Sequence, residues 1–194
     1  MTRKALAVLT ALSATLGCGH APKPPPSSVA VNKCPLNPDS FTSKFRDDRP
    51  PLSKGVACLS LPARTADQVS AWFRDPRHPF LPGKHGGIDL PAPVGTLVFA
   101  PAAGIVTFAG ASEMDTNLVQ VSIGGGWSYH LGHLRVISVE KGQRVLRGQV
   151  LGLSGGEPGD PGSGPCTTGP HLHYSLKYKG ALVDPLKYSC DNRR

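Results

Sequence analysis

Two short histidine-containing clusters carry residue types that together can bind a metal ion. The first, residues 85–89, has the sequence HGGID, and the second, residues 169–173, has the sequence GPHLH. Imidazole nitrogens and carboxylate oxygens are zinc ligands, and an open catalytic zinc site needs three protein ligands with a fourth position for water. The two clusters therefore predict a metalloenzyme.

The local sequence indicates how each cluster presents its side chains. His85 and Asp89 are four residues apart, but the two glycines between them and Pro91 after them favour a loop that enters a strand over a helix. His171 and His173 are two residues apart in a strand-like run, so both imidazoles project from the same face of a sheet. Both of these imidazoles can therefore reach one cavity.

A third pair of histidines lies between the two clusters, in the segment Tyr129 to Leu134. Three residues along a strand reverse the face, so His130 and His133 line one pocket only if a bulge intervenes. We therefore expect one of the two to be a bystander.

The sequence predicts that mainly β-strands position these residues. Short β-rich runs, separated by glycine, proline and polar turns, cover residues 96–100, 104–108, 118–123, 127–131, 136–139, 145–153 and 171–178. The expected fold is mainly β, an antiparallel sheet or sandwich with one or two short helices and long loops. One short helix is predicted over Thr65 to Phe73, before Pro76. Residues 155–169, rich in glycine and proline, predict a long loop beside the second cluster.

The N-terminal residues have the composition of an export signal followed by a tether. Arg3 and Lys4 precede an apolar run that is typical of a secretory signal and too short for a membrane span. Cys18 directly follows Gly17 and resembles the lipidated cysteine of bacterial lipoproteins. We expect a signal peptide at 1–17, a lipid-anchored, proline-rich tether at 18–33, an irregular disulfide-pinned segment at 34–64 and one catalytic domain at 65–190.

The other four cysteines predict two disulfides. Cys34, Cys58, Cys166 and Cys190 form an even set in a chain expected to enter an oxidising compartment. Three pairings are possible. Proximity in sequence suggests Cys34 with Cys58 and Cys166 with Cys190.

The chain of 194 residues is basic, with a formal net charge of +8. This charge suits an anionic polymer or surface, and solubility alone explains it equally well. Lysine and arginine are scattered, and the chain reads as exported, so nucleic acid is not an expected partner.

The motifs, taken together, resemble the lysostaphin-type (LytM-like) zinc metalloendopeptidases. The matching segments are 85–90, 95–106, 132–134, 139–152 and 169–174, and the resemblance spans about residues 66–187. It implies one Zn²⁺ per chain held by His85, Asp89 and His173, with His133 and His171 as catalytic histidines that are not ligands. The chain departs from the family at Arg74, where glycine is usual, and in the length of the loop 155–169.

The function that the resemblance implies is hydrolysis of peptide cross-links in bacterial peptidoglycan. We expect a monomer in the periplasm or cell envelope, anchored to the outer membrane through Cys18 and acting on peptidoglycan stem peptides. Two alternatives are a non-catalytic peptidoglycan-binding module that activates another hydrolase and a zinc protease that acts on proteins. A biotinyl or lipoyl carrier barrel is disfavoured because no hairpin-tip lysine lies between Gly104 and Gly125. The position of residues 29–64 raises the hypothesis that they cover the cleft and hold the enzyme latent.

Overall fold

The computed structural model describes residues 34, 42–63, 69–112 and 116–191. The expected signal peptide, the tether and Cys18 lie outside these residues. Within the described part of the chain, no helix is long and apolar enough to span a membrane.

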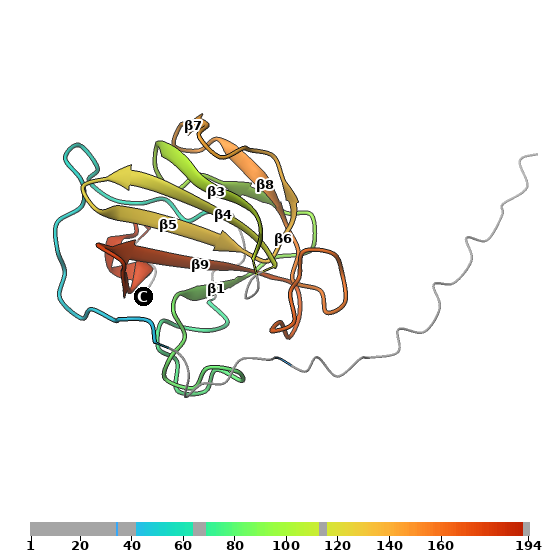
Figure 1. Cartoon of the computed structure of the whole chain (residues 1–194). Coiled ribbons are helices and arrows are strands. Elements are labelled where there is room, and N and C mark those ends of the chain that lie inside the picture. Colours follow the sequence, from blue (N-terminus) through green and yellow to red (C-terminus); the bar gives the residue numbers. More distant parts are fainter. Residues whose placement is uncertain (1–33, 35–41, 64–68, 113–115, 192–194) are drawn as a thin grey trace, which may run out of the picture.

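Ten mostly short strands and one 3-10 helix make up the described fold (Figure 1). The strands are β1 (Ile88–Pro91), β2 (Leu97–Phe99), β3 (Gly104–Ser112), β4 (Thr116–Gly124), β5 (Trp127–Gly132), β6 (Leu134–Ile137), β7 (Arg144–Val145), β8 (Val150–Ser154), β9 (His171–Tyr178) and β10 (Ala181–Val183). The helix η2 (Pro185–Tyr188) follows β10, and the side chain of Asp184 caps it by accepting from the backbone N–H of Leu186.

The strands form two antiparallel sheets. The larger sheet has seven strands in the order β1-β9-β5-β4-β3-β7, with β10 also paired to β9. The smaller sheet has the order β2-β8-β6 and contacts the larger one through β4 and β6. In Figure 1 the long strands β3, β4, β5 and β9 run side by side as the main surface of the molecule.

Side chains of the larger sheet alternate between a core face and a pocket face. In β9, residues 172, 174 and 176 are almost fully buried in the core, whereas residues 171, 173, 175 and 177 line a pocket on the opposite face. Strand β5 follows the same rule, with Trp127, Tyr129 and Leu131 in the core and His130 on the pocket face. This two-residue period places the polar residues of the central strands on one surface.

The predicted mainly β, antiparallel fold is confirmed, with three local differences. The expected run 145–153 is divided into β7 and β8, and β10 was not anticipated. The predicted helix at 65–73 is wrong over residues 69–73, the part that the structure describes. Ala71 instead bridges to Asp89 at the edge of β1, and these backbone hydrogen bonds exclude a helical turn.

The disulfide pairing expected from sequence proximity is also wrong. The bonds join Cys34 to Cys166 and Cys58 to Cys190, so each one ties the N-terminal segment to the C-terminal part of the chain. Cys58 meets Cys190 because the neighbouring Leu59 exchanges backbone hydrogen bonds with Tyr188 and Cys190. Long-range strand pairing, rather than nearness in sequence, decides which cysteines meet.

The described part of the segment 29–64 is built into the fold. Phe45 bridges to Leu182 of β10, and Leu59 and Ala63 are buried in the core. Ser43 is the one described residue of this segment that lines the pocket. Whether the segment restrains activity stays a hypothesis.

Candidate active site

A pocket of about 470 Å³ lies on the polar face of the larger sheet. Its floor comes from β4, β5 and β9, and a wall comes from the loop that precedes β1. The pocket contains all five residues expected to do chemistry, namely His85, Asp89, His133, His171 and His173. Segments far apart in sequence therefore meet in one place.

Strand pairing places Asp89 beside His173. β1 and β9 run antiparallel with these two residues directly opposite each other. Gly87 allows the close approach, because a Cβ at this position would lie 2.3 Å from the carbonyl oxygen of Tyr174. His85, just before β1, is held by its Nδ1–H, which donates to the carbonyl oxygen of Trp72 over 2.8 Å. The backbone N–H of Arg74 donates to the His85 carbonyl oxygen.

Three polar atoms converge with the spacing of metal ligands. His173 Nδ1 lies 2.9 Å from Asp89 Oδ1 and 3.1 Å from His85 Nε2. His85 Nε2 lies 3.3 Å from Asp89 Oδ1, which completes the triangle. A zinc ion with bonds of about 2.0–2.1 Å and tetrahedral angles separates its ligands by about 3.3–3.4 Å. The two nitrogens and one oxygen therefore fit a zinc ion with little movement.

The protonation states of Asp89 and His85 also suit metal binding. Burial alone would raise the pKa of Asp89, but the neighbouring imidazoles of His173, His78 and His85 outweigh it and hold that pKa well below its usual range. Burial is the largest influence on His85 and lowers its pKa below the usual value, despite the opposing effect of Asp89. At neutral pH the site therefore offers a carboxylate and a neutral imidazole, the forms that bind metal.

His133 and His171 are oriented alike by backbone carbonyls. His133 Nδ1–H donates to Ser163 O, and His171 Nδ1–H donates to Gly169 O, each over 2.7 Å. Each ring therefore carries its lone pair on Nε2, the form of a general base. The ring centroids are 4.5 Å apart, and His171 Nε2 lies 3.8 Å from Asp89 Oδ1. The pair borders the triangle formed by His85, Asp89 and His173.

Strict alternation along a strand would put His130 and His133 on opposite faces, but both line the pocket. The expectation that one of the two is a bystander to the chemistry stays a prediction. Strand β5 ends at Gly132, and His133 adopts a left-handed backbone conformation with φ of 58°. This turn replaces the expected alternation and brings the imidazole back to the face of His130. His130 lies farther along β5, where its Nε2 is 3.2 Å from Ser128 Oγ.

His78 is the pocket histidine that sequence reasoning missed. Its ring stacks on His85 with centroids 4.2 Å apart and an interplanar angle of 20°. A ring nitrogen of His78 lies within 4.8 Å of the ligand atoms of His85 and Asp89, so these three residues form a second possible metal-binding set. His173 fits better as the third ligand because His78 Nε2 is 3.7 Å from Asp89, on the Oδ2 side. The available signal was a histidine seven residues before the first cluster.

Known proteins share this fold and these motifs. The Vibrio cholerae peptidoglycan DD-endopeptidase ShyA is 37% identical over 124 residues, which are 62% of this chain and 27% of ShyA. The chain thus spans about a quarter of the length of the curated relatives it matches. A Pseudomonas aeruginosa structure assigned to peptidase M23 has a TM-score of 0.56 and 32% identity, covering 74% of this chain and 54% of that one.

A zinc-containing peptidase from Vibrio cholerae has a TM-score of 0.55 and 28% identity, covering 65% of this chain and 38% of that one. The family model described as peptidase family M23 matches residues 83–185, more than half of the chain. That span contains the triangle of His85, Asp89 and His173 together with His133 and His171. The chain therefore belongs to peptidase family M23.

Proposed function

We propose that this protein is an exported zinc metalloendopeptidase that cleaves peptide cross-links of bacterial peptidoglycan. The observation that carries the proposal is the triangle formed by His85 Nε2, Asp89 Oδ1 and His173 Nδ1, with edges of 2.9–3.3 Å. Membership of a peptidase family supports hydrolysis of an amide bond. The substrate class is supported by ShyA, whose name describes a peptidoglycan DD-endopeptidase.

In this proposal His85, Asp89 and His173 hold the zinc ion. Bound zinc supplies a Lewis acid and lowers the pKa of a water ligand to about 7. His133 and His171 each donate a hydrogen bond from Nδ1–H to a backbone carbonyl oxygen, which leaves the lone pair on Nε2. Each Nε2 can therefore accept a proton from the attacking water. The protonated imidazole can then return the proton to the leaving amine. The other imidazole can stabilise negative charge on the substrate oxygen when it is protonated, because its Nε2–H then donates a hydrogen bond.

Location at the cell envelope is the remaining part of the proposal. The apolar N-terminal run and Cys18 support export and lipid anchoring. The formal charge is +8, and +6 remains when Arg3 and Lys4 are removed with residues 1–17, which supports contact with an anionic wall polymer. Mass spectrometry of the mature N-terminus tests this part, because a lipidated Cys18 as the first residue is expected. An intact Met1 would contradict export.

The activity is tested by metal analysis and digestion of isolated sacculi. We expect one zinc per chain in the unaltered protein and release of cleaved cross-linked muropeptides, identified by mass spectrometry. His85→Ala is expected to lose both zinc and activity. His133→Ala is expected to keep zinc and lose roughly 10²–10⁴-fold in rate, the usual contribution of a general acid or base.

The same experiment separates the alternative functions. A zinc-loaded protein that leaves sacculi intact but increases their digestion by another hydrolase would point to the non-catalytic module. Cleavage of an unstructured protein with intact sacculi would point to a protease that acts on proteins. Full activity of either histidine variant would contradict the assigned site.

A further inference from the structure

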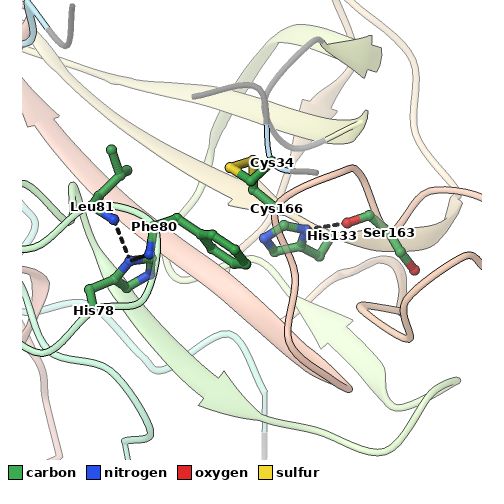
Figure 2. The surroundings of a disulfide bond; sticks show 7 residues. All are labelled: Cys34, His78, Phe80, Leu81, His133, Ser163 and Cys166. Carbon is green, nitrogen blue, oxygen red and sulfur yellow. Dashed lines mark hydrogen bonds between the residues drawn. A yellow bond between two sulfur atoms is a disulfide. The ribbon is translucent and has the colours of Figure 1, made fainter. Parts of the chain in front are cut away.

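His78 differs from the other pocket histidines in the way its ring is held. It lies in the loop before β1, and its side chain is largely buried. Its Nδ1 lies 3.3 Å from the backbone nitrogen of Phe80 and 3.0 Å from that of Leu81. Figure 2 shows both contacts on the same side of the ring. The loop backbone therefore fixes the orientation of the imidazole.

These two contacts determine which nitrogen carries the proton. Backbone N–H groups only donate, so Nδ1 must accept from Phe80 and Leu81 and cannot bear a proton. A neutral His78 ring therefore carries its proton on Nε2. His85, His133 and His171 have the opposite arrangement, because each directs its Nδ1–H to a backbone carbonyl oxygen.

The protonated nitrogen of His78 faces the carboxylate of Asp89. Nε2 lies 3.7 Å from Oδ2, whereas Oδ1 faces His173 Nδ1 and His85 Nε2. The two carboxylate oxygens are thus divided between His78 and the two ligand nitrogens. A separation of 3.7 Å exceeds a direct hydrogen bond, but a small side-chain rotation can close it and a water molecule can bridge it. Stacking on His85 holds the His78 ring in this position.

We propose that His78 is a positioning residue of the metal centre, which donates from Nε2–H to Asp89 Oδ2 and so keeps Oδ1 directed at the metal. An Nε2–H group offers no lone pair, so in this tautomer His78 is not itself a ligand. Donors that orient a ligating carboxylate typically change metal affinity by 10–100-fold when they are removed. This inference rests on the metal centre proposed above.

Two substitutions at the same position separate the two nitrogens of His78. In His78→Asn the side-chain oxygen can replace Nδ1 as acceptor for the loop N–H groups, but nothing reaches Asp89. In His78→Gln the amide nitrogen can replace Nε2 as donor to Asp89. The measurement is the zinc dissociation constant from competition with a chelator, together with the absorption spectrum of the Co²⁺-substituted protein. Urea unfolding of the zinc-free proteins checks that both variants are folded.

We expect His78→Asn to bind zinc about 10–100-fold more weakly and His78→Gln to stay within about threefold of the unaltered protein. The Co²⁺ spectra should keep the same intensity, because the ligand set is unchanged. Unaltered affinity in His78→Asn would overturn the inference. Equal weakening in both variants would also overturn it, because only the packing on His85 would then matter.

A Co²⁺ spectrum that shows loss of a ligand in His78→Asn would overturn the inference in another way, by making His78 a ligand. Failure of the metal centre itself gives a different result. In that case the unaltered protein binds no zinc, and the proposed function and this inference fall together.

Discussion

His133 donates its Nδ1–H to the carbonyl oxygen of Ser163 over 2.7 Å, and both groups are buried. Ser163 belongs to the loop 155–169, whose Cys166 is bonded to Cys34 and lines the pocket (Figure 2). A loop without regular secondary structure thus sets the orientation of a proposed catalytic histidine. The disulfide that holds the loop is therefore expected to affect the reaction rate as well as stability.

Removal of that disulfide by Cys34→Ser together with Cys166→Ser tests this relationship. We expect the free energy of unfolding to fall by about 2–5 kcal/mol. We expect kcat to fall by roughly tenfold or more, because a loosened Ser163 carbonyl no longer fixes the His133 ring. Zinc content should not change, because the proposed ligands lie outside this loop. Urea unfolding, turnover of muropeptides and metal analysis measure the three quantities.

The second disulfide is a matched control. Cys58 and Cys190 are separated by 132 residues, the same separation as Cys34 and Cys166, so the chain-entropy model gives both bonds a similar effect on stability. Neither Cys58 nor Cys190 lines the pocket. Cys58→Ser with Cys190→Ser should therefore lower stability and preserve kcat. An equal fall in kcat for both pairs would show that the loop contact is not the cause.

Local patterns in the sequence predicted the fold well because each strand repeats a two-residue period. The runs that became β4, β5 and β9 alternate between core and pocket residues, and this alternation also placed His171 and His173 on one face. Prediction failed where long-range pairing decides local structure. Ala71 pairs with Asp89 instead of entering a helix, and Cys58 meets Cys190 across the chain.

The site was predictable to the extent that it depends on clustered residues. His85, Asp89 and His173 lie in motifs, whereas His78 stands alone in a proline-containing loop whose path no local pattern specifies. The position of His133 depends on a single left-handed residue at the end of β5. Histidine adopts this conformation more often than most residues, but the sequence does not mark where it occurs.

Gly87→Ala should damage both stability and the metal centre. The added Cβ would lie 2.3 Å from the carbonyl oxygen of Tyr174 and 3.0 Å from His173 Cε1, so β1 and β9 must separate. We expect a loss of about 1–3 kcal/mol in the free energy of unfolding, measured with urea, and weaker zinc binding. Gly86→Ala is the control, because the three atoms nearest to its added Cβ all belong to the Leu182 side chain and none to the backbone of β9. Comparable losses in the two variants would contradict the proposed close approach.

Arg74 is a non-glycine residue in the left-handed backbone region, with φ of 55°. A non-glycine residue in this left-handed region costs about 1–2 kcal/mol. Arg74 partly offsets this cost through an exposed ion pair with Asp47 and a contact over the Phe45 ring. Arg74→Ala removes these contacts and keeps the strain, so it should be about 1 kcal/mol less stable than Arg74→Gly. Urea unfolding measures the difference, and the reverse order would contradict this explanation.

The zinc-free protein should lose stability as the pH falls below neutrality. Burial, the largest influence, lowers the folded-state pKa of His85 below its ordinary value of 6.5. At pH values between the two pKa values of His85, the unfolded chain binds more protons than the folded protein. The contribution of neutral His85 to the free energy of unfolding is therefore complete above pH 6.5 and is lost as the pH falls through the folded-state pKa. The slope from one such group is at most about 1.4 kcal/mol per pH unit. Protonation of Asp89 also lowers the stability of the folded protein, but only below the ordinary pKa of this carboxyl group, 3.8.

Urea unfolding of the zinc-free protein between pH 7 and pH 5 measures this dependence, since the window starts just above the ordinary pKa of His85, 6.5, and extends below it. His85→Gln removes the titrating group and keeps a polar side chain of similar reach, so its stability should fall less steeply over the same window. The comparison of slopes cancels the contributions of the other histidines, which both proteins retain. Equal slopes would mean that His85 is not the buried neutral imidazole that the pocket geometry indicates.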